Sequence, residues 1–126
     1  MKRFAATVLL MITLPLGAQN YPSRPIRMMV PAAAAGVTDI AARVLTPRLS
    51  ETLGQSVVVD NRAGAGGVVG TEIVSKAAPD GYTLLLSAPG PLAVNKSLYS
   101  KLSYDSDTFV PITVVSTSHS VLIVHP

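Results

Sequence analysis

Three short apolar runs recur along the chain at regular intervals. They are residues 25–30 (PIRMMV), 56–60 (SVVVD) and 82–86 (YTLLL), each bounded by proline, glycine or polar residues. Runs of four to eight apolar residues with such boundaries are typical of buried β-strands. The pattern therefore predicts three strands, and because the runs are nearly continuous rather than alternating, it favours strands covered on both faces.

The stretches between these runs have helical spacing instead. After the first run, apolar residues recur on one face of a helix at Ile40, Val44, Leu45, Leu49 and Leu53. Gly54 suits the left-handed residue that ends many helices, and Thr38 or Asp39 is the expected N-cap. After the second run, a glycine-rich turn over 61–70 opens a shorter helix with Ile73, Val74 and Ala77 on its apolar face.

The alternation of strands and helices predicts the fold class. A β-α-β-α-β order with apolar strands indicates an α/β fold with a parallel sheet and right-handed crossovers. Two later apolar runs, 112–115 and 121–124, are predicted to add strands, and residues 92–99 a short helical turn. Ligands of such sheets bind beyond the carboxyl ends of the strands, so the loops 31–38 and 87–91 are expected to face one cleft.

The first of these loops has the composition of an anion site. Residues 31–36 (PAAAAG) carry almost no side chain beyond a methyl group, so backbone N–H groups can approach a ligand closely. A loop that ends a strand and opens a helix also directs N–H groups and the positive end of the helix dipole at one place. An ordinary strand-to-helix connection is the alternative interpretation of this stretch alone.

The first 18 residues have a different character from the rest. Lys2 and Arg3 precede an apolar run over 4–16, and a small residue, Ala18, follows, a pattern typical of a cleaved secretory signal peptide. Its removal lowers the formal charge from +3 to +1 through loss of Lys2 and Arg3, and leaves residues 19–126 as a single small domain. We expect export to the periplasm, where a chain without cysteine folds without disulfides.

Composition and motifs argue against several other functions. Basic residues are scattered and aromatic residues are few, which indicates no nucleic-acid partner. The run from Gly64 departs from the dinucleotide pattern because Val69 holds the sixth position and the glycine follows at Gly70. With two separated histidines, no cysteine and no nucleophile elbow, we expect neither a metal, a cofactor nor an enzyme.

Several longer segments resemble a known family. They are YPSRPIRMMVP (21–31), GVTDIAARVLTPRLSETLGQSVVVDNRAGAGG (36–67), KAAPDGYTLLL (76–86), NKSLYSKLSYD (95–105) and FVPITVVSTSHSVLIVHP (109–126). Together they resemble the Bug receptors, the periplasmic substrate-binding proteins of tripartite tricarboxylate transporters. The resemblance implies two α/β lobes that close on a small carboxylate, as in a type II (Venus-flytrap) binding protein, and a partnership with inner-membrane transporter subunits.

The resemblance also implies which residues bind the ligand. The two loops would hold one carboxylate, largely through backbone N–H groups and ordered water, and the matching positions are Pro31, Ala32, Ala35, Gly36, Thr38, Asp39, Ser87, Ala88 and Gly90. The second loop departs from the family pattern of hydroxyl residues around a glycine. Here it reads Ala88-Pro89-Gly90-Pro91, and its two prolines remove two N–H donors.

Length sets a further expectation. Two lobes of about 100–150 residues each exceed this chain, so residues 19–126 correspond to the N-terminal lobe of a receptor, and the chain to a truncated copy. The ligand implied is a di- or tricarboxylate, an amino acid or an aromatic acid. The alternatives are a non-functional receptor remnant and an anion- or nucleotide-binding α/β enzyme domain.

Overall fold

The structure is a computed structural model that describes residues 20–119 and 121–125. The expected signal peptide over 1–18 lies outside the described residues and stays a prediction. Within the described part, no helix combines the length and apolar character needed to cross a membrane.

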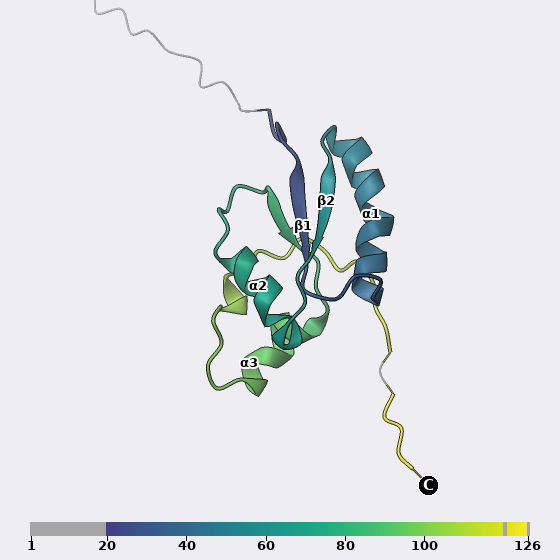
Figure 1. The fold of residues 1–126 in the computed structure, drawn as a ribbon, viewed down its shortest axis with the longest axis vertical. Helices are drawn as coiled ribbons and strands as arrows, with labels where there is room; N and C mark the ends of the chain where they lie inside the picture. Colours follow the sequence, from purple (N-terminus) through teal and green to yellow (C-terminus); the bar gives the residue numbers. More distant parts are fainter. Residues whose placement is uncertain (1–19, 120, 126) are drawn as a thin grey trace, which may run out of the picture.

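Three parallel strands form the sheet, as the apolar runs predict (Figure 1). They are β1 (Ile26–Val30), β2 (Val57–Asn61) and β3 (Thr83–Leu85), arranged in the order β2-β1-β3. Ile26 pairs with Val57 and Val30 with Asn61, so β1 and β2 end at the same level of the sheet. The α/β fold class is therefore confirmed.

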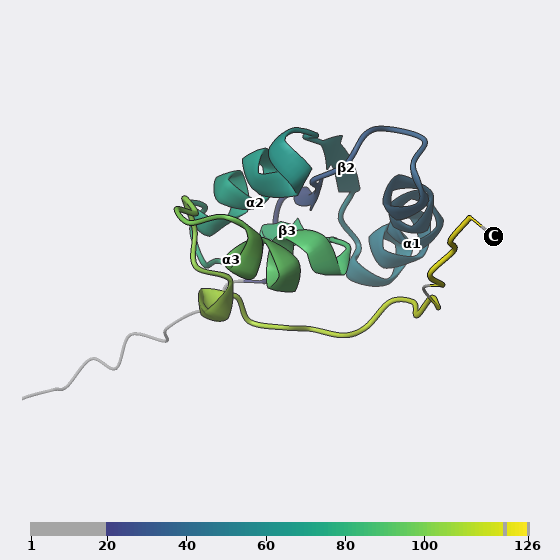
Figure 2. The same ribbon diagram turned by 90° about the horizontal axis from the view of Figure 1, so that it is seen from below.

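Two helices cover opposite sides of this sheet (Figure 2). Helix α1 (Val37–Leu53) connects β1 to β2, and α2 (Val68–Ser75) connects β2 to β3 after a 3-10 turn at Ala65–Gly67. The step from β1 to β2 and the step from β2 to β3 move across the sheet in opposite directions. Because both crossovers are right-handed, the two helices lie on different faces. A π-helical turn at Gly90–Val94, α3 (Asn95–Leu98) and a 3-10 turn at Ser106–Thr108 follow β3.

The core lies between the sheet and α1. Ile26, Met28 and Val30 point to this face of β1 and pack with Ala42 of α1 and Val57 of β2. Met29 points to the opposite face, yet it is as fully buried as Val30. Burial on both faces explains why the strand reads as a continuous apolar run.

Helix α1 differs from its predicted orientation in two respects. Its N-cap is Gly36, without a side-chain cap, so the prediction of Thr38 or Asp39 as the cap is wrong. Ile40 and Val44 are exposed, by 56% and 72%, and the buried positions are Asp39, Ala42 and Thr46. The helix approaches the sheet along this row of smaller residues, with Leu49 and Leu53 partly buried beside it, and the αL residue Gly54 ends it as predicted.

The predicted strands at 112–115 and 121–124 are wrong. The described residues there have no regular structure, and Ile112, Val114, Leu122 and Ile123 are each more than three-quarters exposed. A strand is stabilised by a neighbouring row of backbone partners, and among the described residues this segment pairs with none. Residues 108–118 instead line an apolar hollow of about 1410 Å³ together with residues of α1, β3 and the end of α2, such as Leu45, Leu84 and Val74.

Candidate functional site

A cavity of about 250 Å³ lies where the loops that follow the three strands meet. Its walls are Pro31, Ala32, Thr38, Gly66, Ser87, Ala88, Gly90 and Pro91. The loops after β1 and β3 thus face one cavity, as the parallel sheet predicts.

The structure brings six of the nine predicted site residues to this cavity. Pro31, Ala32, Thr38, Ser87, Ala88 and Gly90 line it. Ala35, Gly36 and Asp39 do not: Ala35 is exposed, Gly36 is the N-cap of α1, and Asp39 is buried behind the loop.

The sequence did not predict a third wall. Gly66 lines the cavity from the glycine-rich turn after β2, which was predicted to open a helix and was not predicted to bind the ligand. The predicted parallel sheet could have indicated this wall. The carboxyl ends of parallel strands lie at the same edge of a sheet, so the turn after the second strand belongs beside the other two loops. Pro91, at the end of the 87–91 loop, completes the lining.

The base of the cavity is built by close approach of glycines and prolines. A Cβ atom on Gly67 would lie 2.5 Å from Cγ of Pro91 and 3.2 Å from the carbonyl oxygen of Pro31. A Cβ atom on Gly70 would lie 2.9 Å from Cα of Pro31 and 2.8 Å from the carbonyl oxygen of Arg62. These glycines therefore serve a tight turn and the close packing of α2 against the residue that follows β1.

Side chains from α3 and the loop after it fix this arrangement. The buried Tyr104 hydroxyl donates to the carbonyl oxygen of Pro91 at 2.6 Å. The Asn95 amide nitrogen donates to the carbonyl oxygen of Gly66 at 3.1 Å. The second wall is therefore tied to the segment that follows α3, and the third wall to α3 itself.

The first wall supplies hydrogen-bond donors. Thr38 is the second residue of α1, and the first N–H groups of a helix have no intrahelical carbonyl to bond. The loop before them, residues 31–36, carries no side chain larger than proline. The cavity wall at Thr38 therefore lies at the positive end of a 17-residue helix, an arrangement that favours anions.

A polar cluster supports this wall from behind. The buried carboxylate of Asp39 accepts a hydrogen bond from the Ala35 backbone N–H at 2.7 Å and one from Nε of Arg43 at 2.9 Å. The Arg43 guanidinium, the Ala35 N–H and the Asn61 amide lower the pKa of Asp39 to about 2, against the opposing effect of burial. Asp39 is therefore a charged anchor for the loop.

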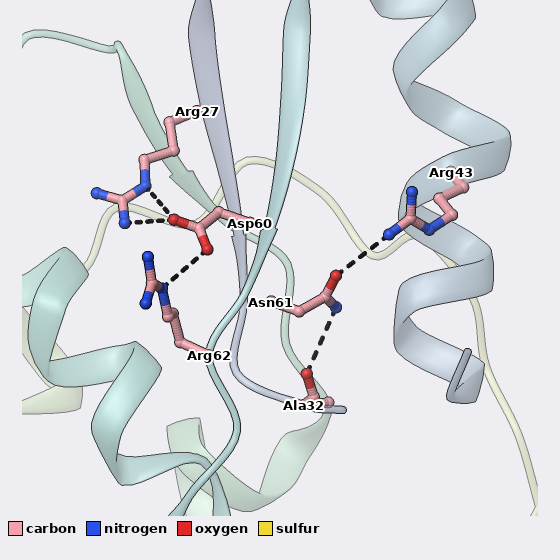
Figure 3. A network of polar contacts seen from close by, with 6 residues as sticks. All are labelled: Arg27, Ala32, Arg43, Asp60, Asn61 and Arg62. Carbon is pink, nitrogen blue, oxygen red and sulfur yellow. Dashed lines mark hydrogen bonds and ion pairs between the residues drawn. The ribbon is translucent and has the colours of Figure 1, made fainter. Parts of the chain in front are cut away.

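A second cluster lies on the other face of the sheet (Figure 3). Asp60 accepts hydrogen bonds from Nε of Arg27 and Nε of Arg62, each at 2.9 Å. Burial raises the pKa of Asp60, but the two guanidinium groups outweigh burial and hold it below its usual value. Successive residues of β2 thus point to opposite faces, Asp60 toward the α2 side and Asn61 toward α1.

Comparison with known proteins identifies the family. The model of the tripartite tricarboxylate transporter family receptor matches residues 41–126. The chain belongs to this receptor family. Among the described residues, no group of histidine and acidic side chains is arranged to hold a metal ion. One solved structure similar to this chain is a periplasmic transporter, which is 47% identical with a TM-score of 0.66 over 68% of this chain and 29% of its own.

Individual relatives of the receptor extend well beyond this chain. Protein BugT of Bordetella pertussis is 50% identical over 117 residues, which are 91% of this chain and 36% of BugT. An R. palustris protein solved with adipate is 41% identical, with a TM-score of 0.67, over 70% of this chain and 29% of its own. MatC from Rhodopseudomonas palustris, solved with bound malate, is 39% identical, with a TM-score of 0.66, over 69% and 30%. The chain thus spans about a third of the length of the relatives it matches.

The charge on Asp39 makes the free energy of unfolding of this chain depend on pH. Its pKa is lowered from 3.8 to about 2, so the folded state binds fewer protons than the unfolded state between these values. This contribution is complete above about pH 4 and disappears as the pH falls toward 2. We expect the urea midpoint, followed by circular dichroism, to fall over this interval, and Asp39→Asn to make the fall shallower. Some dependence of the urea midpoint on pH should remain in Asp39→Asn because the pKa of Asp60 is also lowered. A pH dependence as steep as in the unsubstituted chain would contradict the role given to Asp39.

Proposed function

We propose that the chain forms one side of a receptor site for a small carboxylate, which the whole protein delivers to a tripartite tricarboxylate transporter in the periplasm. The observation that carries the proposal is the cavity at the N-terminal end of α1. It is lined by loops after all three strands, and its walls are small residues that leave backbone groups accessible.

The physical chemistry of this cavity suits a carboxylate. Charge-assisted hydrogen bonds to an anion contribute about 1.5–3 kcal/mol each, and a helix N-terminus adds about 0.3–1 kcal/mol. Among the residues that the structure describes, no acidic side chain lines the cavity, since Asp39 is turned toward Ala35 and Arg43. The hydroxyl groups of Thr38 and Ser87 are the polar side-chain groups on its walls.

Relatives support the ligand class. The R. palustris proteins solved with adipate and with malate align over more than two-thirds of this chain, and both ligands are dicarboxylates. The family description supports delivery to a tripartite transporter. Because the matched part of this chain covers only about a third of each relative, we further propose that a second lobe closes over the cavity in the complete receptor.

Chemical-shift titration of the ¹⁵N-labelled chain with adipate tests the proposal, because it detects binding even at millimolar affinity. We expect the largest amide shifts at Ala32, Thr38, Gly66, Ala88 and Gly90. Shifts confined to residues remote from the cavity, or no saturable shifts with adipate or malate, would contradict it.

Substitution of the exposed Ala88 separates charge from size. Ala88→Glu places a carboxylate on the cavity wall, and Ala88→Gln adds the same volume without the charge. Repulsion between like charges should weaken adipate binding at least about tenfold more in the Glu variant than in the Gln variant. The difference should shrink with added salt, and equal affinities would show that the cavity does not select anions.

A further inference from the structure

We propose that Asn61 is a positioning residue for the carboxylate site: its amide joins the loop 31–36 to α1 and fixes the loop in the conformation that forms the cavity wall. This inference rests on the proposed function for its ligand, and on the observed contacts for its geometry. Figure 3 shows Asn61 between Arg43 and Ala32.

The position of Asn61 follows from the sheet. Asn61 is the last residue of β2 and pairs with Val30, the last residue of β1. The loop that begins at Pro31 therefore starts beside it. Strand alternation turns the Asn61 side chain to the α1 face, where the loop and the first turns of α1 lie.

The two ends of the amide have different partners that fix its orientation. The nitrogen Nδ2 donates to the carbonyl oxygen of Ala32 at 3.4 Å, and the oxygen Oδ1 accepts from Nη2 of Arg43 at 3.3 Å. A carbonyl only accepts and a guanidinium only donates, so an amide satisfies both partners and a carboxylate does not.

From Arg43 the chain of contacts returns to the loop. Nε of Arg43 donates to the carboxylate of Asp39, which also accepts from the backbone N–H of Ala35. The loop is thus held at two points, the carbonyl of Ala32 and the N–H of Ala35. Asn61 contacts the first directly and is linked to the second through Arg43 and Asp39. Ala32 lies on the cavity wall, so one of these points belongs to the site itself.

The loop conformation requires such support. Ala35 has a φ of +64°, in the left-handed region that costs a residue with a Cβ atom free energy. Strained backbone persists where surrounding contacts determine it. The hydrogen bond from Ala35 to Asp39 is one such contact. Arg43 keeps the carboxylate in place, and Asn61 in turn binds Arg43.

An isosteric pair of substitutions at adjacent residues tests the inference. Asn61→Asp removes the donor to Ala32 and offers Arg43 a second carboxylate that competes with Asp39. Asp60→Asn makes the reverse exchange one residue earlier, on the opposite face, where it weakens the contacts to Arg27 and Arg62. Both changes preserve side-chain volume, so a difference between them reports on the face that is affected.

Three measurements on the ¹⁵N-labelled chain give the answer. Asn61→Asp should speed hydrogen exchange of the Ala35 amide about tenfold, shift the amides of 32–38, and weaken adipate binding by about fivefold to tenfold. Asp60→Asn should change exchange and affinity by less than about twofold, even where it lowers the melting temperature equally. A fourth measurement, thermal melting of both variants, separates general destabilisation from the local effect.

The outcomes distinguish this inference from the proposed function. Unchanged Ala35 exchange in Asn61→Asp, or an equal change in Asp60→Asn, overturns the positioning role. If the unsubstituted chain binds no carboxylate, the proposed function fails, and the exchange measurement still decides whether Asn61 holds the loop. Local loosening in Asn61→Asp with unaltered adipate affinity would limit Asn61 to a structural role and also overturn the inference.

Discussion

Gly67→Ala should destabilise the fold by about 2–5 kcal/mol. Gly67 has a φ of +88°, and an added Cβ atom would lie 2.5 Å from Cγ of Pro91 and 3.2 Å from the carbonyl oxygen of Pro31. The backbone strain and the overlap act together, because the turn cannot move away from one wall of the cavity without approaching the other. Urea unfolding followed by circular dichroism measures the loss.

Gly54→Ala is the matched control for this substitution. Gly54 also has a positive φ, +68°, but a Cβ atom there would meet nothing within 4 Å. It should cost about 1–2 kcal/mol from backbone strain alone. Equal losses at the two glycines would show that the contact between Pro31, Gly67 and Pro91 contributes nothing.

Tyr104→Ala is the second substitution with a large expected effect, a loss of about 3–5 kcal/mol. The Tyr104 ring is buried, 6.3 Å from the ring of Phe109 between centroids, and its hydroxyl donates to the carbonyl oxygen of Pro91. Removing the ring opens a cavity and also releases Pro91. Thermal melting should therefore show a decrease of more than about 10 °C for a domain of this size.

The series at Tyr104 separates packing from the hydrogen bond. Tyr104→Phe keeps the ring and leaves the Pro91 carbonyl without its donor, so a loss of about 1–2 kcal/mol is expected. Tyr99→Phe, on a residue that is 39% exposed, should change the melting temperature little. A neutral Tyr104→Phe would show that water replaces the hydroxyl at Pro91.

The pattern of neighbouring residues was sufficient to predict those strands and helix ends that depend only on residues close in sequence. The strands around Met28, Val58 and Leu84 were predictable because each apolar run is short and sharply bounded. The end of α1 was predictable because Gly54 adopts a conformation that few other residues tolerate. The convergence of the 31–38 and 87–91 loops followed from a general rule for parallel sheets rather than from any one residue.

Features that depend on distant partners could not be predicted in this way. Helical spacing groups Ile40 and Val44 with Leu49, but the helix is oriented by its contact with the sheet, and Ala42 and Thr46 face inward instead. The run 112–115 has strand composition, but composition does not supply the neighbouring strand. Asn61 looked like part of a turn, because only the folded chain brings Arg43 and Ala32 to it.

The base of the cavity has a consequence for how receptors of this kind diversify. At Pro31, Gly67 and Pro91 the contacts join backbone atoms and proline rings, which have no alternative rotamers with which to adapt to a larger neighbour. Ala88, in contrast, is exposed on the rim and meets no such restriction. Changes of ligand preference during evolution should therefore accumulate at the rim, while the base tolerates almost no variation.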